Sequence, residues 1–277
     1  MSIFLFSVIL FAAFLHALWN TLVKSAPDKF LTTTLVTAFA ALIAVFLLPF
    51  LPSPLVASWP YIIFSSVLQV VYYTLVARVY HTLDIGQAYP IMRGGAPLMV
   101  AVLNLFIQKE TLPPTAWLGI CVISVGILFM TTFRSRSQAS GIILSLFIAA
   151  IIASYTLVDG IGVRLSHAPA AYTLWIFLLT GLPLTGWSVA RNPARIWHYA
   201  KKSWPYGLTG GASTIISYGL ALWAMTYAPI AVVAALRESS ILFVTLISVF
   251  ILREYVSKRR IVGACVIALG GIILRLS

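Results

Sequence analysis

The chain has 277 residues, of which 61% are hydrophobic and 9% are charged. An ordinary soluble domain is about 45–50% apolar and about 25% charged, so this composition excludes a soluble globular protein. Apolar stretches of about 20 residues recur along the whole sequence, and each is long enough to cross a hydrocarbon core about 30 Å thick. The sequence therefore predicts an all-α polytopic membrane protein.

The net charge of +12 comes from 18 Lys and Arg residues against 6 Asp and Glu residues. In a soluble chain such a balance would favour a nucleic-acid partner. Here the basic residues lie mostly in short loops, as cytoplasmic retention of positive charge requires, so no nucleic-acid partner is expected. Cys121 and Cys265 both fall in apolar segments without metal-ligand spacing, and we expect no metal and no cofactor.

Hydropathy and proline punctuation place ten transmembrane helices along the chain, joined by short loops that leave no room for a folded domain outside the bilayer. Any function must therefore lie within the helix bundle. The predicted helices, in chain order, cover residues 2–24, 30–51, 60–80, 86–108, 113–131, 140–160, 170–190, 204–227, 229–252 and 257–276.

The sequence also repeats itself at a shift of 144 residues. Because chance does not align rare residues in one register, we interpret this repeat as an internal duplication into residues 1–137 and 138–277. Each half holds five predicted helices, an odd number, so the two halves form inverted repeats with a site near the membrane midplane between them, as in many transporters. The aligned pairs include Arg93 with Arg237, Glu110 with Glu254, Gly119 with Gly263, Cys121 with Cys265 and Gly126 with Gly270.

The basic residues also predict an orientation. Loops after odd-numbered helices hold 13 Lys and Arg residues, whereas loops after even-numbered helices and the termini hold 3. This bias places the odd loops in the cytoplasm and both termini on the extracytoplasmic side of the cell (inner) membrane. The segment after Met1 lacks the positive region of a signal peptide, so we interpret it as a retained first span.

Polar and ionisable residues at membrane depth mark the candidate site, because a central Arg, Lys or Asp costs roughly 2.5–3.5 kcal/mol on insertion scales. We expect a cavity between the first, third, fourth, sixth, eighth and ninth helices, with the fifth and tenth helices at the periphery. The candidate substrate-binding residues are His16, Trp19, Asn20, Tyr73, Tyr89, Arg93, Tyr155, Asp159, Ser217, Tyr218, Arg237 and Glu238.

The two arginines admit two interpretations. Either both hold an anionic group of the substrate in bidentate fashion, or both form internal salt bridges with Asp159 or Glu238. Arg237 is followed at once by Glu238 in the sequence, so we expect Arg93 to be the freer arginine, with Asp159 as its partner in the empty site. Asp159 and Glu238 are alternatively proton-coupling carboxylates.

Glu110 and Glu254 lie at predicted helix ends, where we expect them to cap the following helix or to pair with basic loop residues. A structural role is therefore expected for both glutamates.

The half-repeat ending in Glu110-Thr-Leu, Trp117-Leu-Gly119 and Gly126, and repeated at Glu254, Gly263 and Gly270, resembles the EamA-type domain of the drug/metabolite transporter superfamily. The segments His16-Ala-Leu-Trp-Asn20, Gln87 to Pro97, Asp159 to Arg164 and Leu236 to Ser240 resemble one branch of that superfamily. The resemblance implies a ten-helix, two-repeat carrier with a central cavity. The superfamily handles amino acids, drugs, nucleotide-linked sugars and other metabolites.

These features predict a secondary active transporter that moves a small polar metabolite with an anionic group, such as an amino acid, an organic acid or a phosphonate-like compound, by alternating access. The alternatives are a multidrug or cation exporter and a flippase for a lipid-linked substrate. No metal-binding, nucleophile-elbow or ATP-binding motif occurs, so we expect no enzymatic activity. Expected partners are the small-molecule substrate, the lipid bilayer and a coupling proton, with the chain as a monomer or homodimer.

Overall fold

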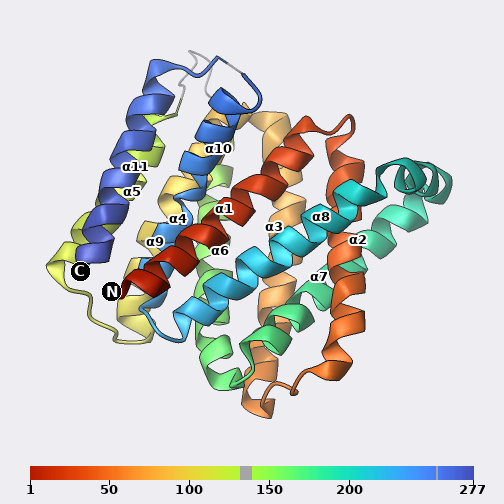
Figure 1. Ribbon diagram of the computed structural model, residues 1–277, viewed down its shortest axis with the longest axis horizontal. Helices are drawn as coiled ribbons and strands as arrows, with labels where there is room; N and C mark the ends of the chain where they lie inside the picture. Colours follow the sequence, from red (N-terminus) through yellow and green to blue (C-terminus); the bar gives the residue numbers. More distant parts are fainter. Residues whose placement is uncertain (132–138, 254) are drawn as a thin grey trace.

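The computed structural model describes residues 1–131, 139–253 and 255–277. Within these ranges every regular element is a helix, which confirms the all-α prediction. The short 3-10 helices are η1 (Leu48–Phe50) and η2 (Val56–Ser58). The α-helices are α1 (Ile3–Ser25), α2 (Lys29–Leu47), α3 (Trp59–Thr82), α4 (Ile85–Ile107), α5 (Pro114–Phe129), α6 (Ala139–Ser166), α7 (Pro169–Arg191), α8 (Pro193–Met225), α9 (Ile230–Arg237), α10 (Ser240–Phe250) and α11 (Lys258–Leu276) (Figure 1).

Each predicted helical range contains a helix, but three ranges differ in detail. The predicted sixth helix continues to Ser166. The predicted ninth helix is broken into α9 and α10. The predicted eighth helix begins earlier, at Pro193, because the Asn192 side chain caps the new helix end by accepting a hydrogen bond from the Arg195 amide at 3.2 Å. Among the described residues, seven helical segments are long and apolar enough to cross a membrane, so ten crossings stay a prediction. The predicted repeat boundary at 137/138 and Glu254 lie outside the described residues.

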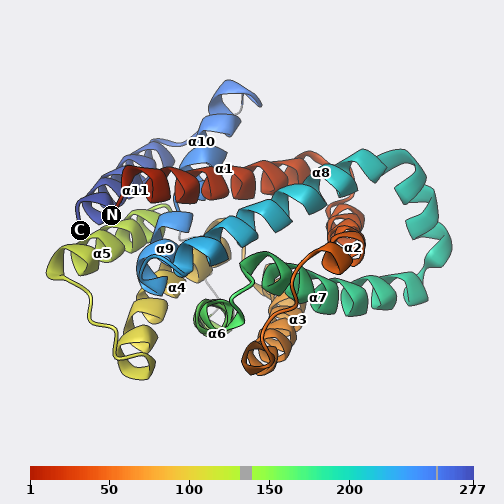
Figure 2. The same cartoon turned by 60° about the horizontal axis from the view of Figure 1, so that its bottom comes forward.

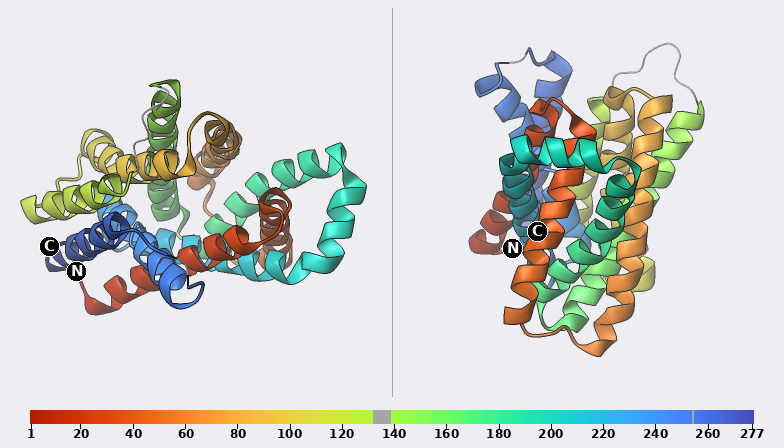
Figure 3. Two further views of the ribbon diagram at one scale, coloured as in Figure 1. Left: turned by 90° about the horizontal axis from the view of Figure 1, so that it is seen from above. Right: turned by 90° about the vertical axis from the view of Figure 1, so that its right-hand side faces the viewer.

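Helices α5 and α11 lie side by side at one edge of the bundle (Figures 1 and 3). Glycines at equivalent positions of the repeat let the two backbones approach closely. An added Cβ on Gly263 would lie 2.7 Å from the Gly126 carbonyl oxygen, and one on Gly270 would lie 3.0 Å from the Gly119 carbonyl oxygen. Small residues that permit close helix approach are the usual contact in membrane bundles.

We expect Gly263→Ala to destabilise the folded protein by about 1–3 kcal/mol, because the new methyl group would meet backbone that cannot move aside. The matched control is Gly186→Ala in α7, where an added Cβ meets nothing within 4 Å. Alanine there should be neutral or slightly stabilising, since it has the higher helix propensity. Thermal denaturation of the two purified variants compares them directly, and equal midpoints would contradict the packing argument.

Helix α6 lies between α3 and α4, and the short helix α9 lies next to α4 (Figure 2). Helix α6 packs against α3 and α4, whereas α8 packs against α1 and α2. Residues 230–236 of α9 are all buried, and the added Cβ of Gly160 on α6 would lie 2.6 Å from Ile230. This tight packing holds the break between α9 and α10 in the middle of the molecule, where it positions charged residues.

Candidate functional site

A cavity of about 100 Å³ lies among seven helices, α1, α3, α4, α6, α7, α8 and α9. It is rich in aromatic rings and in polar groups that can donate hydrogen bonds. The residues lining it are His16, Trp19, Asn20, Gln69, Tyr72, Tyr73, Tyr89, Arg93, Tyr155, Phe177, Thr214, Tyr218 and Arg237. Helices α5 and α11 contribute none of these residues.

Nine of the twelve candidate residues line the cavity, namely His16, Trp19, Asn20, Tyr73, Tyr89, Arg93, Tyr155, Tyr218 and Arg237. The other three lie behind its wall. Ser217 is buried and donates a hydrogen bond to the Ala12 carbonyl oxygen at 2.7 Å, so it joins α8 to α1. Asp159 and Glu238 are buried in polar networks of their own.

Four lining residues were outside the candidate set: Gln69, Tyr72, Phe177 and Thr214. Gln69, Tyr72 and Thr214 belong to polar stripes on their helices, which is a signal that the sequence carries. Phe177 on α7 carries no such signal, because an apolar ring in a membrane helix has the same pattern whether it faces lipid or a cavity. Its ring meets that of Tyr218 edge to face, with centroids 6.1 Å apart.

Arg93 forms a buried ion pair with Glu238, with Nε and Oε2 2.9 Å apart. The prediction that Arg93 pairs with Asp159 is therefore wrong. Arg237 and Glu238 are neighbours where α9 ends, and consecutive helical residues point in directions about 100° apart, so they do not face each other. The break after α9 turns Glu238 toward α4, where Arg93 projects from a helix that continues through Pro90 and Pro97.

The arginine without an acidic partner is Arg237. In the part of the chain that the structure describes, it makes no ion pair, and its guanidinium carbon lies 4.9 Å from the centre of the Tyr218 ring. The expectation that Arg93 is the freer arginine is therefore wrong: both arginines line the cavity, but only Arg93 is paired with a carboxylate among the described residues. A guanidinium over a ring keeps its N–H donors at the edge of the stack, where an anion can reach them.

Asp159 is fully buried and accepts hydrogen bonds from three neutral donors. Tyr172 Oη lies 3.2 Å away, Gln69 Nε2 lies 3.4 Å away, and Tyr218 Oη forms the third and shortest bond. Tyr218 thus contacts the carboxyl group through its hydroxyl and Arg237 through its ring. The Tyr218 side chain therefore lies between the buried Asp159 carboxyl group and the Arg237 guanidinium.

The aromatic residues of the cavity contact one another as well as the cations. The Tyr72 ring lies 5.3 Å from that of Tyr73 and 5.9 Å from that of Tyr155. On α1, Trp19 Nε1 donates to His16 Nδ1 at 3.3 Å. Such rings offer apolar faces together with hydroxyl donors, which suits a small substrate that is polar at one end.

A separate polar cluster around Arg164 connects helix ends away from the cavity. Arg164 Nε donates to the Met225 carbonyl at 2.7 Å and Nη2 donates to the Ala228 carbonyl at 2.9 Å. Glu110 lies 3.7 Å from Arg164 and accepts from Asn104 Nδ2 at 2.8 Å. Glu110 thus pairs with a basic residue at a helix end, as expected, whereas Glu254 lies outside the described residues.

Residues 1–131, 139–253 and 255–277 contain no group of three His, Cys, Asp or Glu side chains able to hold a metal ion.

The comparisons with known proteins agree with this architecture. The model of the EamA-like transporter family matches residues 3–132 and 139–276, which is nearly the whole chain in two repeats. No curated protein matches the chain in sequence. The fold is similar to that of a solved structure described as "Crystal structure of protein", with a TM-score of 0.74. The two chains are 17% identical, and the match covers 98% of this chain and 95% of that chain. The chain belongs to the EamA-like transporter family, and it is a multi-pass membrane transporter of the drug/metabolite transporter superfamily.

Proposed function

We propose that the protein is a secondary active transporter for a small polar metabolite with an anionic group, bound in the central cavity at Arg237. The observation that carries this proposal is the half-buried Arg237, which lines the cavity without an acidic partner among the described residues. A cation at membrane depth needs a counter-charge or water, and a substrate anion supplies the counter-charge. Carboxylate and phosphonate oxygens fit the planar guanidinium in bidentate fashion.

The size of the cavity supports a small substrate. Its volume of about 100 Å³ is below the ~150 Å³ of an engineered cavity that accommodates benzene. This volume is of the order expected for a small amino acid or a short organic acid, whereas a lipid-linked sugar is much larger. The flippase alternative is disfavoured for this reason.

The charges in the cavity also disfavour a cation exporter. Such a protein needs a carboxylate available to the cationic substrate, but Glu238 is paired with Arg93, and Asp159 is covered by Tyr172, Tyr218 and Gln69. We propose that Asp159 instead carries the coupling proton. The side chains that donate hydrogen bonds to it are neutral, and Tyr218 contacts both Asp159 and Arg237. Alternating access would then move the two five-helix repeats around this site.

A thermal-shift screen of the purified protein tests the proposal. A ligand that binds only the folded state raises its apparent stability, by about 2.7 kcal/mol at a concentration 100 times its Kd. We expect stabilisation by members of the amino-acid, organic-acid or phosphonate sets. Stabilisation by organic cations or lipid head groups alone would contradict the proposed substrate class.

The proposed orientation has both termini on the extracytoplasmic side of the inner membrane, because the odd-numbered loops carry the basic residues. We expect a reporter fused after Ser277 that is active only outside the cytoplasm to give a signal. The matched control is the same reporter inserted after Pro27, in the connection between α1 and α2, which should be silent. A signal from a cytoplasm-only reporter at Ser277 would reverse the orientation.

A further inference from the structure

The end of α7 and the beginning of α8 carry large aromatic side chains and cations at the outer edge of the molecule. This segment projects from the other helices and links α7 to the rest of α8 (Figures 2 and 3). Its indole rings are strongly exposed, with Trp187 at 52%, Trp197 at 66% and Trp204 at 51%. We call Trp187, Arg191, Trp197, Lys201 and Trp204 the aromatic shelf.

Helical spacing gives the first part of α8 two distinct faces. Trp197, Lys201 and Trp204 lie four and seven residues apart, so they share one face of the helix. The Lys201 ammonium lies 5.3 Å from the centre of the Trp197 ring. The same arrangement occurs one turn before the end of α7, where the Arg191 guanidinium lies 4.2 Å from the centre of the Trp187 ring.

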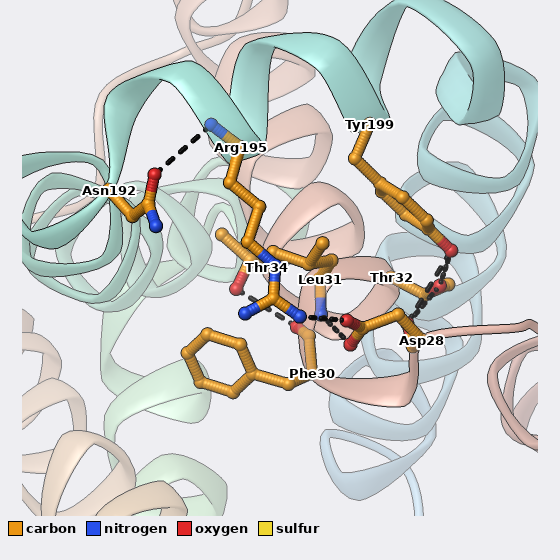
Figure 4. A network of polar contacts seen from close by, with 8 residues as sticks. All are labelled: Asp28, Phe30, Leu31, Thr32, Thr34, Asn192, Arg195 and Tyr199. Carbon is orange, nitrogen blue, oxygen red and sulfur yellow. Dashed lines mark hydrogen bonds and ion pairs between the residues drawn. The ribbon is translucent and has the colours of Figure 1, made fainter.

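The other face of this helix is anchored to the start of α2 (Figure 4). Arg195 pairs with Asp28, with Nη2 and Oδ2 2.7 Å apart, and the Tyr199 hydroxyl lies 2.7 Å from Thr32 Oγ1. Arg195 and Tyr199 are also four residues apart, on the face opposite to Trp197 and Lys201. The shelf is therefore held in a fixed direction by contacts that do not use its own side chains.

We propose that the aromatic shelf binds the head group of an anionic phospholipid. Trp side chains favour the level of the lipid head groups, and Lys and Arg beside that level attract anionic lipids. In the described part of the chain Arg191 and Lys201 make no ion pair with a carboxylate. Each rests on an indole ring, which aligns it while its N–H donors remain open to a phosphate.

The shelf also lies on the membrane side where this ligand is expected. It spans the junction of α7 and α8, which follows the predicted seventh helix, and the proposed orientation assigns this junction to the cytoplasmic leaflet. This inference does not depend on the identity of the transported substrate, because the shelf and the cavity share no residue.

The test compares the thermal midpoint of the protein in phosphatidylcholine nanodiscs with that in nanodiscs that also contain phosphatidylglycerol. We expect the wild-type midpoint to rise with the anionic lipid, and the variant Arg191→Gln/Lys201→Gln to lose that rise. The control variant, Lys258→Gln/Arg259→Gln, removes the same charge from two exposed residues at the start of α11. It should keep the rise.

Each other outcome overturns the proposal. Equal loss in both variants would mean unspecific attraction to the membrane surface. A rise produced by inorganic phosphate in phosphatidylcholine nanodiscs would mean a site for a free anion. Native mass spectrometry of the wild type gives a reading that needs no variant, and we expect it to retain phosphatidylglycerol in preference to phosphatidylcholine. Equal retention of the two lipids would also contradict a head-group site.

Discussion

Replacing Glu238 with Gln should destabilise the folded protein by about 3–5 kcal/mol, because it leaves the Arg93 guanidinium buried without its counter-charge. The ion pair is short, at 2.9 Å, and side-chain exposure is 10% for Arg93 and 6% for Glu238. Water therefore cannot replace the lost carboxylate. The pair also connects α4 to the break between α9 and α10, so its loss should loosen the helices that form the cavity wall.

Denaturation of purified protein in detergent measures this effect, and Glu110→Gln is the matched control. Glu110 also faces an arginine, but at 3.7 Å and with both side chains about a third exposed. A partly exposed pair of this kind contributes at most about 1 kcal/mol. Equal stability of the Glu238→Gln and Glu110→Gln variants would show that Arg93 does not depend on Glu238.

Arg237→Gln should weaken substrate binding by roughly 10- to 100-fold, since a hydrogen bond to a charged group contributes about 1.5–3 kcal/mol. Arg237→Lys should be intermediate, because lysine keeps the charge but loses the planar pair of donors. Both variants should fold, because Arg237 makes no ion pair among the described residues and its guanidinium lies over the Tyr218 ring, beside the cavity. Titration of an acid that stabilises the wild type gives the affinities.

Arg93→Lys separates the roles of the two arginines. Because Arg93 is already occupied by Glu238, this variant should lower stability more than affinity, whereas Arg237→Lys should lower affinity more than stability. If Arg93→Lys instead weakened binding more than Arg237→Lys at equal stability, Arg93 would be the residue that recognises the anion.

The sequence was sufficient to predict much of the fold. Apolar length placed the helices, and the register of Arg93 with Arg237 and of Gly126 with Gly270 exposed the repeat. The break after α9 escaped prediction because Arg237, Glu238, Ser239 and Ser240 include neither proline nor glycine. The early start of α8 escaped it because its polar surface, which includes Arg195 and Lys201, has the composition of a loop.

The pairing of charges could not be predicted from the sequence. Adjacency in the chain made Glu238 look like the partner of Arg237, but adjacent helical residues diverge, and the partner of Glu238 comes from α4. Helical spacing, which predicted that Tyr89 with Arg93, His16 with Asn20 and Tyr155 with Asp159 face the cavity, was more informative. The first two pairs and Tyr155 line the cavity, whereas Asp159 lies behind its wall. The spacing of residues along one helix predicts which of them share a face of that helix. An ion pair between two helices depends on how the helices are placed relative to each other, which the spacing does not give.

The central claim is that the cavity recognises the anionic group of its substrate. The most direct measurement compares each stabilising acid with an otherwise matched neutral-ended analogue, for example alanine with alaninamide or 2-aminoethylphosphonic acid with ethanolamine, by thermal shift on the wild-type protein. The account predicts that the acid stabilises the protein, that its analogue does not, and that Arg237→Gln abolishes the difference. Equal stabilisation by acid and analogue, or a preference for the analogue, would contradict it.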